Sequence, residues 1–418
     1  MVEPVMAAPI TGKWLDRPRL SRLAEGLAVA VAMSLPWSTT ASGILIALWL
    51  LAALLSLDFA DVRGEVLSYP GGLPVLLWLL GFLGVVWADV PWAERLEALS
   101  SFHRLLVIPL LLALFRRSGQ GRPVMVGFLI SAVVLLGASV VHAILWWAKV
   151  PWITGLWPGV PVKDYIAQST IFLICSFGLF GAAVRAWRAQ RRILALSLAL
   201  PALLFLADIG YVATGRTELV VILILTPVFG LRHFGWKGTF GVLIAAAALA
   251  AVAWASSPLI RIQVERIAED VRQYQANNVM TSSGLRLEFY RKSIAIVAQA
   301  PIIGHGTGTI HQEFVRASVG EDPATAIITN NPHQQIFTIA IQIGLVGVAV
   351  LFAMWIAHLA LFRGPDLAAW IGFVIVAQNM ISCQFNSHLF DFASGWLYIF
   401  GVGVIGGMVL HQRSSPPG

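Results

Sequence analysis

The sequence predicts an all-α protein that crosses a membrane many times. Of its 418 residues, 58% are hydrophobic and only 12% are charged, and the mean hydropathy is +0.80. These values lie outside the range of ordinary soluble domains. The apolar residues come in blocks of about 17 to 25, the length that an α-helix needs to cross roughly 30 Å of hydrocarbon.

About twelve such spans can be placed along the chain. Connections rich in arginine, such as 116–122 and 185–192, alternate with connections that contain few basic residues. The positive-inside rule places the basic connections in the cytoplasm, so the others lie outside, which in a Gram-negative cell is the periplasm. The predicted spans are 22–40, 42–58, 71–88, 103–116, 122–148, 167–187, 192–211, 217–233, 238–256, 333–361, 367–386 and 390–410.

This pattern divides the chain into three regions. Residues 1–256 hold the first nine predicted spans, residues 257–332 form a long periplasmic loop, and residues 333–418 hold the last three spans. Within the loop, apolar residues recur at helical spacing over 260–274 and 284–298, which predicts two amphipathic helices.

Composition argues against several other classes of protein. The net charge of +7 comes from basic residues spread over the span ends, not from one patch with aromatic residues, so nucleic acid is not an expected partner. Cys175 and Cys383 both fall in apolar segments and offer neither a disulfide framework nor a zinc site. No acidic or histidine cluster is predicted on the outer face, so we expect chemistry without a metal or another cofactor.

One histidine stands where the long loop meets a membrane span. Pro332 suits the first turn of a helix and Asn331 can cap that turn, which predicts a helix beginning at His333. There the positive end of the helix dipole favours a neutral imidazole, which can accept a proton. The simpler interpretation is an ordinary interfacial histidine.

Two arginines are predicted on the same outer side as this histidine. Arg216 lies in a short polar turn between two spans, where it either snorkels to lipid phosphate or binds an anionic ligand. Arg286 lies near the start of an amphipathic helix, where a solvated surface charge is the simpler interpretation. A guanidinium fork is well suited to pyrophosphate, so the pair together predicts a site for an anionic lipid head group.

Four other residues are expected to support this site. Asp391, at the mouth of the last span, can pair with an arginine or orient His333, although an acid at a helix N-terminus is also favoured by the dipole. The other supporting candidates are His388, Gln334 and Tyr165.

The sequence around these residues resembles a known superfamily, that of bacterial O-antigen ligases and O-antigen polymerases, and the ligases most closely. The resemblance covers most of residues 200 to 350. Two positions depart from the usual pattern: Gln334 stands where Asn is frequent, and Thr217 where a small residue such as Gly is common. The matching pieces are Thr214-Gly215-Arg216, Arg286-Leu287-Glu288, Pro301 to Gly308, and Pro332-His333-Gln334-Gln335 with Gly344 and Gly347.

This resemblance implies a GT-C-like fold in the bacterial inner membrane with its active site on the periplasmic side. The implied donor is a glycan on undecaprenyl pyrophosphate, and the implied acceptor is a sugar hydroxyl of the lipid A–core oligosaccharide. By resemblance, Arg216 and Arg286 would hold the pyrophosphate and His333 would act as general base in an inverting transfer.

Three alternatives remain open from the sequence. An O-antigen polymerase would use the lipid-linked glycan as both donor and acceptor, and a protein O-oligosaccharyltransferase would accept a pilin serine. A lipid or glycan exporter belongs to a different class and needs polar residues on both leaflets. The predicted intramembrane charges cluster on the outer side, which favours an enzyme, with Asp208 the one uncertain position.

Overall fold

The computed structural model describes residues 17–150, 157–212, 215–277, 282–320 and 326–414. These residues form helices, turns and loops, and no strand occurs among them. The predicted all-α class is therefore confirmed. The first half of the chain contains α1 (Arg17–Ser34), α2 (Thr39–Ser56), α3 (Phe59–Val66), α4 (Tyr69–Trp87), α5 (Trp92–His103), the 3-10 turn η1 (Arg104–Leu106), α6 (Val107–Ser118), α7 (Arg122–Trp147), α8 (Tyr165–Arg188) and α9 (Arg192–Tyr211). The second half contains α10 (Arg216–Ser256), α11 (Pro258–Asn277), α12 (Ser282–Gln299), α13 (Ile310–Ala317), α14 (Gln335–Leu361), α15 (Leu367–Ser382), α16 (Phe392–Phe400), the π-helix η2 (Gly401–Ile405) and α17 (Gly406–Ser414).

Within the described residues, nine helical stretches are long and apolar enough to cross a membrane. The helix α1 is not among them, and α15 is shorter than the others. The stretch α10 counts once although Gly235 breaks it, with φ +67° at the place where the sequence predicted a loop between two spans. The protein is thus a multi-pass membrane protein, and the number of twelve spans stays a prediction.

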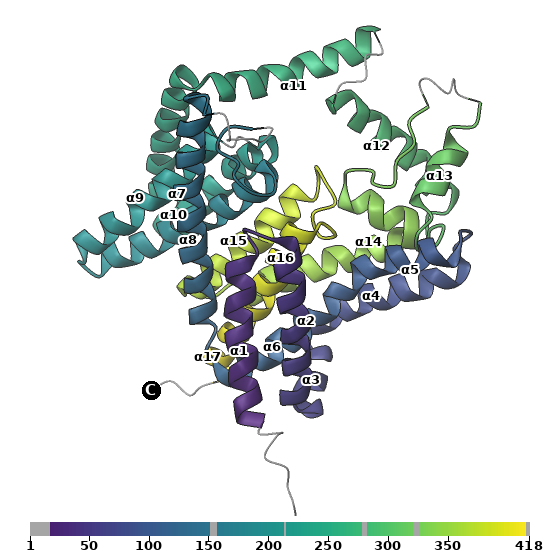
Figure 1. Ribbon diagram of the computed structural model, residues 1–418, viewed down its shortest axis with the longest axis horizontal. Helices are drawn as coiled ribbons and strands as arrows, with labels where there is room; N and C mark the ends of the chain where they lie inside the picture. Colours follow the sequence, from purple (N-terminus) through teal and green to yellow (C-terminus); the bar gives the residue numbers. More distant parts are fainter. Residues whose placement is uncertain (1–16, 151–156, 213–214, 278–281, 321–325, 415–418) are drawn as a thin grey trace, which may run out of the picture.

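The helices differ in how much of their surface is covered by protein. Of the nine stretches, α8 is the most buried and α10 the least. Helix α8 packs mainly on α9 and also on α15, while α1 packs on α2 and α7 (Figure 1). Since α10 is apolar yet exposed, its side chains are suited to contact with lipid.

Helix α14 is broken inside the span predicted for 333–361. Ile343 and Gly344 leave the helical conformation, with φ +66° at Gly344. The freed backbone groups bind the turn at 301–306: the N–H of Leu345 donates to the Pro301 carbonyl at 2.8 Å, and the N–H of Gly306 donates to the Gln342 carbonyl at 2.9 Å. The break therefore ties the predicted periplasmic loop to a membrane helix.

The loop region itself is helical, as predicted. Helices α11 and α12 cover the expected stretches 260–274 and 284–298, whereas the short helix α13 was not predicted. In Figure 1, α12 and α13 lie above α14 on the side of α5. A small apolar core joins them to α14 and consists of Phe289, Ile296, Ile310, Phe314, Ile327 and Ile341.

We expect that Gly344→Ala destabilises the protein. A Cβ at this position would lie 2.1 Å from the Ile302 carbonyl oxygen, which is backbone and cannot move aside. The backbone conformation at this position, φ +66° and ψ −168°, is essentially restricted to glycine and alone costs an alanine roughly 1–3 kcal/mol. The melting temperature of the purified protein in detergent should fall clearly below that of the unmodified chain.

A matched control is Gly43→Ala in α2, where an added Cβ meets nothing within 4 Å. Alanine is the better helix former by roughly 0.5–1 kcal/mol, so this variant should melt at the same temperature or higher. Equal melting of the two variants would contradict the role assigned to the break.

Candidate functional site

His333 lies just before α14 and not inside it. The helix begins at Gln335, and its N-cap is Gln334, whose side-chain oxygen accepts a hydrogen bond from the Phe337 N–H at 3.3 Å. The prediction of a helix starting at His333 is wrong, because the Asn331 side chain accepts from the His333 N–H at 2.9 Å and closes a local turn instead. His333 takes φ +53° in this turn.

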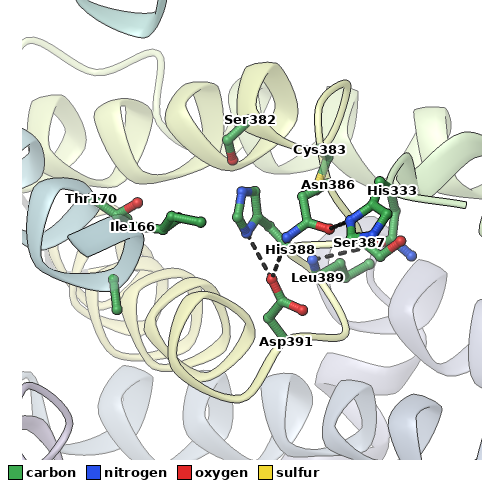
Figure 2. A network of polar contacts seen from close by, with 12 residues as sticks. Ile166, Thr170, His333, Ser382, Cys383, Asn386, Ser387, His388, Leu389 and Asp391 are labelled. Carbon is green, nitrogen blue, oxygen red and sulfur yellow. Dashed lines mark hydrogen bonds and ion pairs between the residues drawn. The ribbon is translucent and has the colours of Figure 1, made fainter. Parts of the chain in front are cut away.

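The His333 ring is held by Asn386 and Phe289. Its Nδ1 lies 3.0 Å from the Asn386 Oδ1 (Figure 2). Its plane stacks on Phe289 with 5.6 Å between the ring centroids. The Asn386 amide is in turn oriented by Asp391, because its Nδ2 donates to the Asp391 Oδ2 at 3.2 Å. An amide oxygen accepts only, so Nδ1 carries the proton and Nε2 keeps its lone pair.

Asp391 shares its Oδ2 between two partners. Besides Asn386, the Nδ1 of the buried His388 lies 2.8 Å from this oxygen. The backbone carbonyl of Asp391 accepts from Arg104 at 2.6 Å, which fixes the start of α16. The expected orientation of His333 by Asp391 thus runs through Asn386 and is not direct.

Arg286 acts on His333 through its charge. Burial is the largest effect on the imidazole and lowers its pKa below the ordinary value of 6.5. The positive charge of Arg286 and the neighbouring His388 lower this pKa as well, whereas the hydrogen bond to Asn386 and the charge of Asp391 raise it. The net result is a lowered pKa, which favours the neutral imidazole.

Arg216 contacts the helix that follows α10 in the chain. It opens α10, and its Nε donates to the Gln263 side chain of α11 at 2.9 Å. Two residues further on, the buried Glu218 accepts from Thr170 of α8 at 2.9 Å and interacts electrostatically with His388. Thr214 of the predicted motif lies outside the described residues.

A set of polar contacts therefore joins the loop before α16 to the turn before α14. It runs from His388 through Asp391 and Asn386 to His333. Glu218, two residues after Arg216, interacts with His388 electrostatically.

The other supporting candidates have structural contacts. Tyr165 is the first residue of α8 and packs edge-on against Trp157, with 5.6 Å between the ring centroids. It is Ile166 and Thr170 of this helix that Figure 2 draws beside His388. Gln334 serves as the cap of α14.

Asp208 lies at the end of α9 that leads into the Arg216 turn. Its carboxylate accepts from Ser139 at 2.5 Å and from Gln168 at 3.2 Å, and both donors are buried. Asp208, whose side of the membrane was uncertain from the sequence, is therefore a buried acid with hydrogen-bond partners. It lies at the same end of the helices as Arg216, as expected if the polar groups of the site share one side of the membrane.

Sequence reasoning missed Asn386, Glu218, Phe289 and Tyr290. The Tyr290 hydroxyl donates to the Gln384 carbonyl at 3.1 Å and lies 3.4 Å from the His333 carbonyl, so it binds the two loops together. Two features of the sequence could have indicated such residues. Several polar residues lie between two apolar helices at 384–391, and an acidic residue follows Arg216 inside a predicted span.

Residues 201–352 match the family described as O-antigen ligase. The chain carries an O-antigen ligase domain. No curated protein matches the sequence. The O-antigen ligase domain includes Arg216, Glu218, Arg286 and His333, while Asn386, His388 and Asp391 follow it in the chain. The match supports a function of the O-antigen ligase or polymerase type, that is, transfer of a glycan with glycan and lipid substrates in general.

We expect the His333 imidazole to titrate below pH 6.5, so that between its own pKa and 6.5 it is neutral while an ordinary histidine is protonated. Arg286→Gln removes a positive charge and should raise the His333 pKa, because the imidazolium is then repelled less. NMR titration of protein labelled on its histidine rings measures both values, with His333→Gln identifying the resonance. A His333 pKa at or above 6.5, or one unmoved by Arg286→Gln, would contradict this assignment.

Proposed function

We propose that the protein joins an O-antigen glycan from undecaprenyl pyrophosphate to a sugar hydroxyl of the lipid A–core oligosaccharide, at the periplasmic face of the inner membrane. The observation that carries this proposal is the contact between His333 and Asn386, with 3.0 Å between Nδ1 and Oδ1. It leaves Nε2 as the nitrogen that can take a proton. A neutral imidazole at a site that also holds an arginine is suited to glycosyl transfer.

The proposed reaction is a single displacement. The acceptor hydroxyl oxygen attacks the anomeric carbon of the donor glycan, its proton passes to the His333 Nε2, and the bond from that carbon to the pyrophosphate oxygen breaks. The electron pair of that bond leaves with the pyrophosphate. Attack opposite the leaving group inverts the anomeric configuration.

The two arginines have the complementary task in this proposal. As pyrophosphate departs, negative charge grows on it, and guanidinium groups stabilise such charge with paired N–H donors. The electrostatic effect of Arg286 on His333 supports a position near the reacting atoms. Arg216, at the start of α10, would hold the other end of the pyrophosphate, and the positive end of that helix favours an anion there.

The polar contacts behind His333 support its role as a base. When the imidazole takes a proton, its Nδ1–H still faces Asn386, and the negative Asp391 lies next to that amide. The developing positive charge is thus stabilised without direct contact between ring and carboxylate. His388 on the far side of Asp391 fixes the carboxylate in this orientation.

We expect His333→Ala to lower transfer by roughly 10²–10⁴-fold, the usual contribution of a general base. Purified protein would be given a lipid-linked glycan and lipid A–core, and the ligated product measured on a gel. The control is His411→Ala, because His411 is a half-buried residue of α17 whose ring contacts the Arg116 carbonyl, away from the His333 loop, and this change should leave transfer unchanged. Substantial ligation by the His333 variant would remove the base role; a product in which glycan is joined to glycan would indicate a polymerase instead.

Arg286→Lys should raise the donor KM by about tenfold or more, because lysine keeps the positive charge but cannot make the bidentate hydrogen bonds of a guanidinium group with pyrophosphate. The matched control is Arg291→Lys on the same helix. Arg291 is exposed and pairs with Glu288 one turn away, so this change should leave the donor KM within about twofold. Equal behaviour of the two variants would remove Arg286 from pyrophosphate binding.

A further inference from the structure

A polar cavity of about 520 Å³ opens beside the His333 loop. Its wall is formed by α5, the start of α13, residues 330–331, α14 and the loop before α16. This volume is within the range of pockets that hold small ligands. In Figure 1, α5 lies next to α14 and below α13, so the three helices frame one side of the molecule.

The wall offers hydrogen-bonding groups and negative charge. Its lining includes Glu94, Glu97, His311, Asn331, Ser387 and Asp391, and no lysine or arginine is among the residues that line it. Glu94 and Glu97 are exposed on α5, while Thr338 and Ser387 form a buried floor with 2.7 Å between their hydroxyl oxygens. Carboxylates and amides bind sugar hydroxyls well, but this wall would repel a pyrophosphate.

The cavity is directly connected to the His333 loop. Asn331 accepts from both the His333 N–H and the Ser387 hydroxyl, each at 2.9 Å. Asp391, whose side chain is 37% exposed, contacts His333 through Asn386. A ligand in the cavity therefore lies against two residues that position the histidine.

The outer wall is held at a fixed distance by Gly308. Its N–H donates to the Gln342 side chain at 2.9 Å, and a Cβ at Gly308, where φ is +97°, would lie 2.9 Å from the Glu94 carbonyl oxygen. Only glycine allows this close approach of the loop to α5. The glycine-rich turn thus holds α5 and α14 around the cavity.

We propose that this cavity binds the acceptor saccharide, as an uncharged stretch of sugar whose hydroxyls contact Glu94, Glu97 and Asn331. The inference rests on the proposed function and adds to it: the acceptor sugar has a binding site separate from the arginines. Neither Arg216 nor Arg286, which would hold the pyrophosphate, is among the residues that line the cavity.

A pair of neighbouring serines tests this arrangement. Ser101 lines the cavity, whereas Ser100 on the same helix is exposed and does not. Ser101→Trp should fill the cavity and raise the acceptor KM by about tenfold or more, with the donor KM and the melting temperature unchanged. Ser100→Trp should leave all three values within about twofold or a few degrees of the unmodified protein.

Two further measurements make the test independent of folding and of the reaction. Glu97→Gln is nearly the same size, and it should raise the acceptor KM by severalfold because a carboxylate acceptor is lost. Binding of dephosphorylated core oligosaccharide to the full-length protein, without donor, can be followed by saturation-transfer NMR. The unmodified protein should give a signal that Ser101→Trp loses.

The outcomes separate the two proposals. Unchanged acceptor KM and binding in Ser101→Trp, with normal transfer, would overturn the cavity assignment and leave the transferase in place. A rise in the donor KM alone would assign the cavity to the donor glycan and overturn the inference. Sugar binding that Ser101→Trp abolishes, in a protein that transfers no glycan, would support the cavity and overturn the reaction.

Discussion

The contact between Asn386 and His333 is the interaction on which the site depends. An amide has one accepting and one donating end, and Asp391 takes the donating end, so only the oxygen can face the imidazole. Because this oxygen can only accept a hydrogen bond, it fixes the tautomer of the His333 ring with the proton on Nδ1. Phe289 covers one face of the same ring, so the histidine is held by a polar partner at its edge and an apolar partner on its plane.

Burial explains why the polar groups behind His333 form a connected set. Glu218 and His388 are almost completely inaccessible, where an unsatisfied polar group is expensive, and each is placed against other polar groups. Three segments far apart in the sequence supply these residues: the start of α10, the start of α14 and the turn between α15 and α16. The same contacts thus stabilise the packing of the helices and define the site.

The helices were predictable because they follow from local properties of the chain. Runs of apolar residues of membrane-spanning length indicated α2, α4, α7, α8 and α9, and the amphipathic stretches indicated α11 and α12. The start of α14 was not predictable from Pro332, because the turn that displaces it uses Asn331, which is itself held by Ser387 from another loop. The break at Gly344 likewise depends on backbone groups of residues 301–306, more than 35 positions earlier in the sequence.

By itself, the sequence determined the all-α membrane class, because composition is a local property. It also offered His333, Arg216, Arg286 and Asp391 as candidates for the chemistry, because residue type can be read position by position. Only the tertiary structure decided that Asp391 contacts His333 through Asn386, that the buried Glu218 accepts from Thr170 of α8, and that a cavity of polar residues opens beside α5. These features arise from hydrogen bonds and packing between distant segments. No periodicity or spacing along the chain encodes them, since each depends on which side chains meet once the helices have packed.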